Sequence, residues 1–168
     1  GSIEGMVNYG KMLENGEGVQ MNKTEACRYY KMAADNGCQE AMVNYGKMLK
    51  NGEGVSMNKT EACRYYKTAA DNGCLKAMIN YGTMLKNGEG VSKNKTEACR
   101  YYKMAADKGC PEGMFNYGKM LENGEGVSMN KTEACRYYKM AADNGNMQAM
   151  FDYGLMLAKG EGVSMNKE

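Results

Sequence analysis

The segment NKTEACRYYKMAADNGC occupies residues 22–38 and returns at 58–74, 94–110 and 130–146, each time with a single substitution. The copies are 36 residues apart, and a Tyr-Gly pair recurs at the same interval, at 9–10, 45–46, 81–82, 117–118 and 153–154. A fixed period of this length is typical of solenoids, in which each repeat is one supersecondary unit. Full repeats are therefore predicted at 2–37, 38–73, 74–109 and 110–145, followed by a partial repeat at 146–168.

Each repeat begins with the pattern of an amphipathic helix, here named helix A. In the second repeat, Ala41, Tyr45, Met48 and Leu49 lie at i, i+4, i+7 and i+8, which places them on one face of a helix. The position just before this pattern is the predicted N-cap, and it is occupied by Ser2, Cys38, Cys74, Cys110 and Asn146. Gly52-Glu53-Gly54 ends the helix, because Gly adopts positive φ without steric cost.

A second helix, helix B, follows in every repeat. Asn58-Lys59-Thr60-Glu61 is typical of a capping box, in which the Asn side chain accepts from an amide of the first turn and the Glu side chain reaches back. The apolar face of the helix is predicted to contain Ala62, Cys63, Tyr65, Tyr66, Ala69 and Ala70. Gly73 supplies a left-handed C-cap.

Two antiparallel helices of this length do not bury their apolar faces alone, so neighbouring pairs must stack. The sequence predicts an all-α fold: a right-handed α-solenoid of antiparallel helix pairs with 36-residue repeats, forming one domain over residues 1–168. Gly46, in the middle of helix A, indicates a close approach that we expect the ring of Tyr65 or Tyr66 to fill. Replacing its equivalent Gly82 by Leu is predicted to destabilise the fold strongly.

Composition argues against several classes of function. Twenty-two basic and twenty acidic residues give a net charge of +2, with both signs mixed in every repeat, which gives no support to binding of nucleic acid or membrane surfaces. No stretch approaches the ~20 apolar residues of a membrane span. Gly1-Ser2 is typical of a cloning remnant and the sequence stops within a repeat, so we expect a piece of a longer protein. The expected location is the cytoplasm.

The residues also give little support to catalysis. The chain has no His, which excludes histidine-dependent nucleophiles and histidine metal sites. Gly52-x-Gly54 joins two helices and is therefore interpreted as a turn and not as a phosphate-binding loop. Carboxylates such as Glu53 and Asp71 are interpreted as turn and surface groups. We expect no enzyme activity, no cofactor and no metal.

The seven cysteines form two sets. Cys27, Cys63, Cys99 and Cys135 lie on the apolar face of helix B and are interpreted as small apolar fillers. Cys38, Cys74 and Cys110 take the place of the Ser or Asn that caps helix A elsewhere. Members of the two sets are too far apart for disulfides, so seven free thiols are predicted. The alternative for the second set is a redox sensor, because a helix N-terminus favours a thiolate.

The pattern A-x-x-N-x-G-x-M-x-x-N-G-x-G-V at 41–55, followed by N-x-x-E-A-x-x-Y-Y-K-x-A-A-D-x-G at 58–73, resembles the Sel-like repeat family, a relative of tetratricopeptide repeats. One departure is that Tyr45 and Leu49 exchange the family's usual Leu and Tyr. The resemblance covers the chain and implies a scaffold or adaptor that gathers proteins. Two alternatives stay open: a secreted, cysteine-rich relative with one disulfide per repeat and an enzyme-like or ligand-binding activity, and an artificial array without a natural partner.

A polar ladder on helix A is the first candidate for partner binding. It consists of Asn8 and Lys11, Asn44 and Lys47, Asn80 and Thr83, and Asn116 and Lys119. By analogy with tetratricopeptide grooves, the ladder is expected to line the concave face and to bind an extended peptide or protein segment. The alternative is that Asn44 and its equivalents hydrogen-bond the backbone or neighbouring helices.

An apolar stripe near the C-terminus is the second candidate. The column Val7, Val43, Ile79, Phe115 and Phe151 grows in size along the chain, and Leu155 and Ala158 follow Phe151 at i+4 and i+7. Further repeats would cover this stripe, or it would bind a partner or a second copy of the chain. The loop methionines Met21, Met57, Met129 and Met165 are expected to pack within their loops.

Overall fold

The computed structural model describes residues 2–163, and within that range it contains nine α-helices and no strand. The helices are α1 (Ile3–Asn15), α2 (Lys23–Asp35), α3 (Gln39–Asn51), α4 (Lys59–Asp71), α5 (Leu75–Asn87), α6 (Lys95–Asp107), α7 (Pro111–Asn123), α8 (Lys131–Asp143) and α9 (Met147–Lys159). Odd-numbered helices are the predicted A helices, and even-numbered ones are the B helices. The prediction of an α-solenoid built from repeated helix pairs is confirmed.

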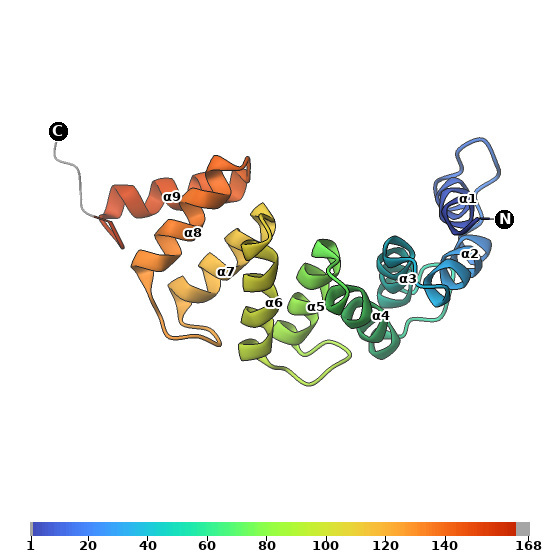
Figure 1. Cartoon of the computed structure of the whole chain (residues 1–168), viewed down its shortest axis with the longest axis horizontal. Helices are drawn as coiled ribbons and strands as arrows, with labels where there is room; N and C mark the ends of the chain where they lie inside the picture. Colours follow the sequence, from blue (N-terminus) through green and yellow to red (C-terminus); the bar gives the residue numbers. More distant parts are fainter. Residues whose placement is uncertain (1, 164–168) are drawn as a thin grey trace. The chain divides into compact units, whose positions relative to one another are not determined.

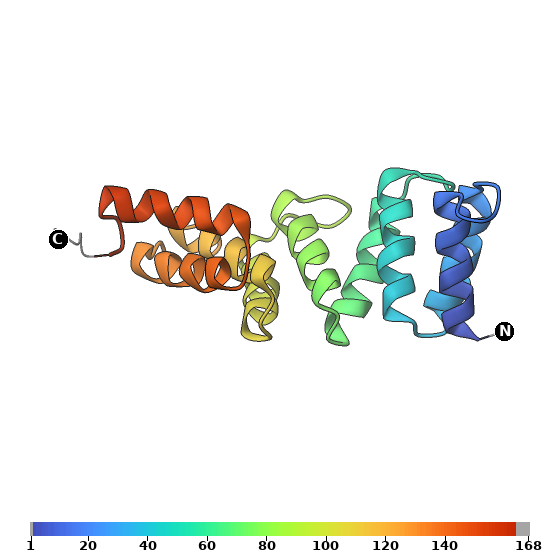
Figure 2. The ribbon, with the colours of Figure 1, turned by 90° about the horizontal axis from the view of Figure 1, so that it is seen from above.

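The helices form two compact units. The first contains α1 to α4 and most of α5, and the second contains α6 to α9. In the first unit α1 packs on α2, α2 on α3 and α3 on α4; in the second α6 packs on α7, α7 on α8 and α8 on α9. Figures 1 and 2 show these neighbours side by side within each unit. In the first, second and fourth repeats the A helix therefore packs on the B helix of its own repeat.

The helix ends follow the predicted signals with one exception. Helix α3 ends at Gly52, whose φ is 68°, and the Asn58 side chain accepts a 3.0 Å hydrogen bond from the Glu61 amide. The other half of the predicted capping box is wrong. The Asn58 amide donates to the carbonyl of Leu49 at 2.8 Å, so it does not need the Glu61 carboxylate, which pairs with Arg64.

The cysteines at the start of helix A occupy the N-cap position without making its hydrogen bond. Ser2 accepts from the Gly5 amide at 3.0 Å and Asn146 from the Ala149 amide at 2.8 Å. The thiols of Cys38, Cys74 and Cys110 make no such bond. The prediction that they substitute for Ser or Asn is therefore correct for the position and wrong for the bond, because sulfur is a weak acceptor.

The glycine in the middle of helix A receives a tyrosine ring from helix B. A Cβ atom added to Gly46 would lie 2.5 Å from Cε1 of Tyr66, and one added to Gly118 would lie 2.8 Å from the same atom of Tyr138. The second tyrosine of the pair thus fills the site, and Tyr66 and Tyr138 are almost fully buried. The predicted apolar faces of α3 and α4 are buried throughout.

A contact between successive repeats was not predicted. The Cys27 thiol donates a 3.1 Å hydrogen bond to the carbonyl of Glu53 in the next repeat, and the Lys23 ammonium lies 3.4 Å from the Glu53 carboxylate. A Cβ on Gly54 would overlap the Lys23 carbonyl. We name this set of contacts the loop clamp. It recurs with Cys63 on Glu89 and Cys99 on Glu125, so these thiols are donors as well as fillers.

Candidate functional site

The predicted ladder lies on the side of helix A that is not covered by helix B. Asn8 and Lys47 are exposed, and Asn44, Asn80 and Asn116 are half-buried. Within residues 2–163, the amides of these last three residues make no hydrogen bond to the protein. The alternative in which they bond the backbone or a neighbouring helix therefore has no hydrogen bond to support it. The amides face solvent with donors and acceptors free.

Two lysines of the ladder are held by carboxylates of the next A helix. Lys11 on α1 pairs with Glu40 on α3, and the Lys119 ammonium lies 3.1 Å from the Asp152 carboxylate on α9. Asp152 is only 7% exposed. It was missed as a ladder residue, although its column carries Asn in every earlier repeat. These ion pairs neutralise the ladder between α1 and α3 and between α7 and α9.

The ladder has no such ion pair in the middle of the first unit, between α3 and α5. Lys76 on α5 occupies the position that Glu40 has one repeat earlier, so the carboxylate that would pair with Lys47 is replaced by a second ammonium. Both lysines are exposed, and no ion pair to either occurs in the described part of the chain. The stretch of ladder around Asn44 and Asn80 therefore carries uncompensated positive charge.

The apolar surface of α9 is wider than predicted. Phe151 is 62% exposed, and the surface also contains Met147, Met150 and Leu157. Leu155 lies at the edge and lines a small pocket of about 90 Å³ with Lys119 and Asp152. Phe115, the equivalent of Phe151 in the fourth repeat, is half-buried against Tyr138 with 5.8 Å between ring centroids.

The loop methionines do not pack as expected. The side chains of Met21, Met57 and Met129 are 57%, 61% and 63% exposed. Met165 lies outside the described residues.

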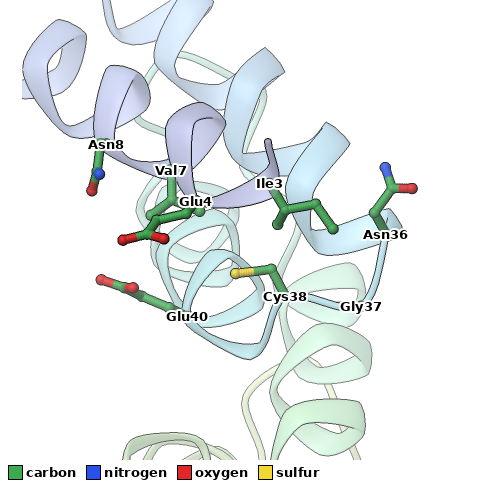
Figure 3. A pocket seen from close by; sticks show the side chains of 8 residues that line it. All are labelled: Ile3, Glu4, Val7, Asn8, Asn36, Gly37, Cys38 and Glu40. Atoms are coloured by element: carbon green, nitrogen blue, oxygen red, sulfur yellow. The ribbon is translucent and has the colours of Figure 1, made fainter. Parts of the chain in front are cut away.

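A pocket of about 400 Å³ opens between the first turns of α1 and α3. Figure 3 shows the Cys38 sulfur directed into it, with Glu4, Glu40 and Asn8 among the other residues that line it. A redox-sensing thiol is usually activated by a nearby basic group. The eight residues that line this pocket include no Lys or Arg, so the pocket does not favour the sensor interpretation of Cys38.

All seven cysteines are free thiols, as predicted. The cysteine-rich, secreted alternative requires disulfides that this structure does not contain. Burial raises the pKa of the Cys27 and Cys99 thiols from an ordinary value of 9.0 to about 11, with a smaller contribution from nearby glutamates. Burial also raises the pKa of Cys63 and Cys135. These four thiols are therefore poor nucleophiles at neutral pH.

Between residues 2 and 163, no group of three or more acidic, Cys or His side chains is arranged to hold a metal ion. In the same range, every helix is too short and too polar to span a bilayer.

The family model described as "Sel1 repeat" matches residues 3–38, 39–74, 75–110, 111–146 and 148–168. Its boundaries fall one residue after the predicted boundaries of the first four repeats. Among curated proteins no match was found.

Two solved structures are similar over almost the whole chain. One is c5321, described as a protective antigen of uropathogenic Escherichia coli strains with an SLR fold, with 30% identity, a TM-score of 0.94, and coverage of 99% of this chain and 36% of that chain. The other is a Sel1 repeat protein from Oxalobacter formigenes, with 30% identity, a TM-score of 0.92, and coverage of 98% of this chain and 66% of that chain. The present chain therefore spans less than two thirds of either protein.

A third structure, cysteine rich protein B of Helicobacter pylori, shares the fold at lower similarity. Its identity is 19% and its TM-score 0.64, and the alignment covers 77% of this chain and 96% of that chain.

Proposed function

Because the chain belongs to the Sel1 repeat family, whose members generally act as protein-interaction scaffolds, we propose that it is a non-catalytic scaffold that binds an extended segment of a partner protein along helix A. The proposed contact residues are those of the ladder, centred on Asn44, Lys47, Lys76 and Asn80.

The observation that carries this proposal is the set of unused polar groups on α3 and α5. Asn44 and Asn80 are partly buried amides without a protein partner, and an extended peptide offers backbone donors and acceptors that such amides can bind. An unpaired polar group gains a hydrogen bond when such a peptide binds, and each bond is worth about 1 kcal/mol.

Charge selects the side chains of the partner. Lys47 and Lys76 occupy the positions that Lys11 and Glu40 have one repeat earlier, so two ammonium groups stand where an ion pair would form. A carboxylate of the partner supplies the missing negative charge. The preferred segment is therefore acidic at the point where it crosses α3 and α5. Because both lysines are exposed, salt should weaken the interaction.

Selection of a random peptide library on the immobilised chain tests the proposal. We expect Asp and Glu to be enriched among the selected peptides, and the double substitution Asn44→Ala and Asn80→Ala to weaken their binding at least tenfold in fluorescence anisotropy. The substitution Lys76→Glu should weaken binding as well, because it recreates the pairing found between Lys11 and Glu40.

The substitution Lys93→Glu is the matched control, because it makes the same change of charge at an exposed residue outside the A helices. Binding that responds equally to Lys76→Glu and Lys93→Glu would reduce the interaction to net charge. Binding that survives the double Asn substitution would place the partner on another surface.

We further propose a reducing compartment such as the cytoplasm. The support is chemical: seven free thiols persist where glutathione keeps cysteine reduced. In addition, Asn22-Lys23-Thr24 and its copies are N-glycosylation acceptor sequences placed on the N-caps of helix B, where a glycan would displace the cap. Mass analysis of the chain from its native source tests this, since a glycan or a disulfide would contradict it.

A further inference from the structure

Asparagine followed by glycine occurs seven times in this chain, at two kinds of position. Four copies end helix A, where the last helical residues are Asn15, Asn51, Asn87 and Asn123. Three copies end helix B, where the C-cap residues are Asn36, Asn72 and Asn144. An asparagine amide hydrolyses readily before glycine, because glycine has no side chain to shield its backbone nitrogen from the neighbouring carboxamide. Each copy is therefore a candidate site of spontaneous modification.

The two kinds of copy differ in what holds the asparagine side chain. The Asn72 carboxamide donates to the Thr68 carbonyl at 2.7 Å, and its counterparts in the first and fourth repeats make the same bond. The Asn51 carboxamide is exposed and makes no hydrogen bond within residues 2–163. The glycine amides do not differ in this way, since Gly52 and Gly73 both donate to a carbonyl of the last turn. Only the Asn51 side chain is thus free to turn toward the next backbone nitrogen.

Hydrolysis of Asn51 places a carboxylate four residues after Lys47, on the same face of α3. Helix B already contains this arrangement. The Lys31 ammonium of α2 lies 2.8 Å from the carboxylate of Asp35, and the same pair recurs in α4, α6 and α8. Asn51 is the last residue of α3, as Asp35 is the last residue of α2. A carboxylate at the end of α3 therefore has the position from which helix B binds its lysine.

Lys47 is the lysine whose charge such a carboxylate changes most. Lys11 also stands four residues before the asparagine that ends its helix, but Glu40 already pairs with it. The same is true of Lys119, which pairs with Asp152. Lys47 is exposed and makes no ion pair in the part of the chain that the structure describes. Its ammonium is one of the two that select an acidic partner in the proposed function.

We propose that Asn51 is a self-modification site that regulates the ladder. The Gly52 nitrogen attacks Cγ of Asn51, the bond between Cγ and Nδ2 breaks, and ammonia leaves with the proton that the glycine nitrogen loses. Water then opens the cyclic imide and leaves a carboxylate, as aspartate or isoaspartate. This carboxylate pairs with Lys47, so hydrolysis weakens the binding of an acidic partner. The regulation rests on the proposed function, whereas the modification does not.

Peptide mapping by mass spectrometry tests the modification. The whole chain is incubated at mildly alkaline pH, which favours loss of the glycine proton, and aspartate and isoaspartate are quantified at each Asn-Gly copy over time. We expect Asn51 to be modified at least about fivefold faster than Asn72, the difference that one hydrogen bond to the Asn72 carboxamide makes. Equal rates at the two residues would overturn the proposal.

The acidic peptides selected on the chain test the regulation. Asn51→Asp should weaken their binding by about two- to fivefold, which is the range of an exposed ion pair. Asn15→Asp is the matched control, because it makes the same change at the same position of α1, where Lys11 is already paired, and it should leave the affinity unchanged. The original chain should lose affinity as Asn51 hydrolyses, and the Asn51→Gln chain should keep it after the same incubation.

Equal losses of affinity in Asn51→Asp and Asn15→Asp would reduce the effect to net charge and overturn the regulation. Unchanged affinity after complete hydrolysis of Asn51 would overturn it as well. A selection that yields no acidic peptide would instead contradict the proposed function, and the regulation with it. The relative rates at Asn51 and Asn72 would still decide whether Asn51 is a modification site.

Discussion

The tyrosine ring of helix B leaves room only for glycine at the middle of helix A. The sequence indicates a close approach at Gly46, but Tyr65 and Tyr66 are adjacent on helix B, and only the structure distinguishes them. Tyr66 lies on the glycine, and Tyr65 packs instead on Tyr45, edge to face, at 5.1 Å between centroids. Side-chain direction one residue apart on a helix depends on helix rotation, which periodicity fixes only approximately.

Substitution of this glycine by alanine should reduce stability where the ring is present. Alanine favours the helix by about 1 kcal/mol, but its methyl group would lie 2.5 Å from the Tyr66 ring in Gly46→Ala. Overpacking of this kind costs about 1–3 kcal/mol, so we expect a net loss of up to about 2 kcal/mol in the free energy of unfolding in urea.

The same substitution at Gly154 is the internal control. No ring is present there, so Gly154→Ala should stabilise the chain by about 1 kcal/mol through helix propensity alone. Changes of the same sign at both positions would contradict the explanation that the Tyr66 ring excludes a larger residue at Gly46. The predicted effect of Gly82→Leu belongs to the same class and stays a prediction.

Stability should fall as the solution becomes alkaline. Burial raises the pKa of Cys27 and Cys99 from 9.0 to about 11, so above pH 9 the unfolded chain releases these protons while the folded chain keeps them. The folded state therefore loses stability progressively between pH 9 and 11. Buried tyrosines such as Tyr66, whose pKa is also raised by burial, add to the slope.

Thermal melts at pH 8, 9, 10 and 11 measure this effect. The double substitution Cys27→Ala and Cys99→Ala should lower the melting temperature at pH 8, because two loop clamps lose their donor, and should make its decline with pH less steep. A decline of unchanged slope would assign the alkaline sensitivity to tyrosines alone.

Whole helices were the easiest elements to predict. Each helix starts after an N-cap residue and ends before a glycine, and those signals are local in sequence. The capping box was predicted only in part, because the Asn58 amide is satisfied by Leu49 at the end of the preceding helix. That partner belongs to another element, and a local motif does not reveal it.

The start of helix A offers a stabilising substitution. Cys74 stands at the N-cap of α5 without a side-chain hydrogen bond, whereas Ser2 makes this bond on α1. Cys74→Ser should therefore raise the free energy of unfolding by about 0.5–1 kcal/mol, measured by chemical denaturation.

Asn146→Ala provides the reverse experiment, since it removes a cap that is present on α9. We expect a loss of about 1 kcal/mol. If Cys74→Ser had no effect while Asn146→Ala lost stability, the thiol would be an adequate cap and the missing bond would be unimportant.

In the molecule as a whole, the period of 36 residues predicts how the chain is divided but not how successive repeats are joined. The loop clamp connects Cys27 and Lys23 to Glu53 and Gly54, and no residue pattern within one repeat indicates it. The like-charged pair Lys47 and Lys76 was missed for the same reason, because each lysine is unremarkable in its own repeat. Contacts between repeats need the structure.

The clamp can be tested with two glycines of the same backbone conformation. Gly54 has φ 70° and touches the Lys23 backbone, whereas Gly18 has φ 72° and only the tip of Met12 near its Cβ position. Gly18→Ala should cost about 1 kcal/mol for the left-handed conformation alone. Gly54→Ala should cost about 2–3 kcal/mol, because the methyl group also separates two repeats.

Urea unfolding followed by circular dichroism compares the two variants. The Gly54→Ala transition should also be broader, since weaker coupling between neighbours makes a repeat array less cooperative. Equal costs for both substitutions would mean that the loop does not couple the repeats.

The clamp gives the first three junctions between repeats the same chemistry: the start of one helix B is bound by the loop that follows the next helix A. A segment of 36 residues copied in frame carries both the helix B start and the loop of a clamp. Each of them can therefore pair with its counterpart in the neighbouring repeat. Such a chain can grow or shrink by whole units during evolution without redesigning a single contact. The number of repeats is then set by gene duplication and not by a change of fold.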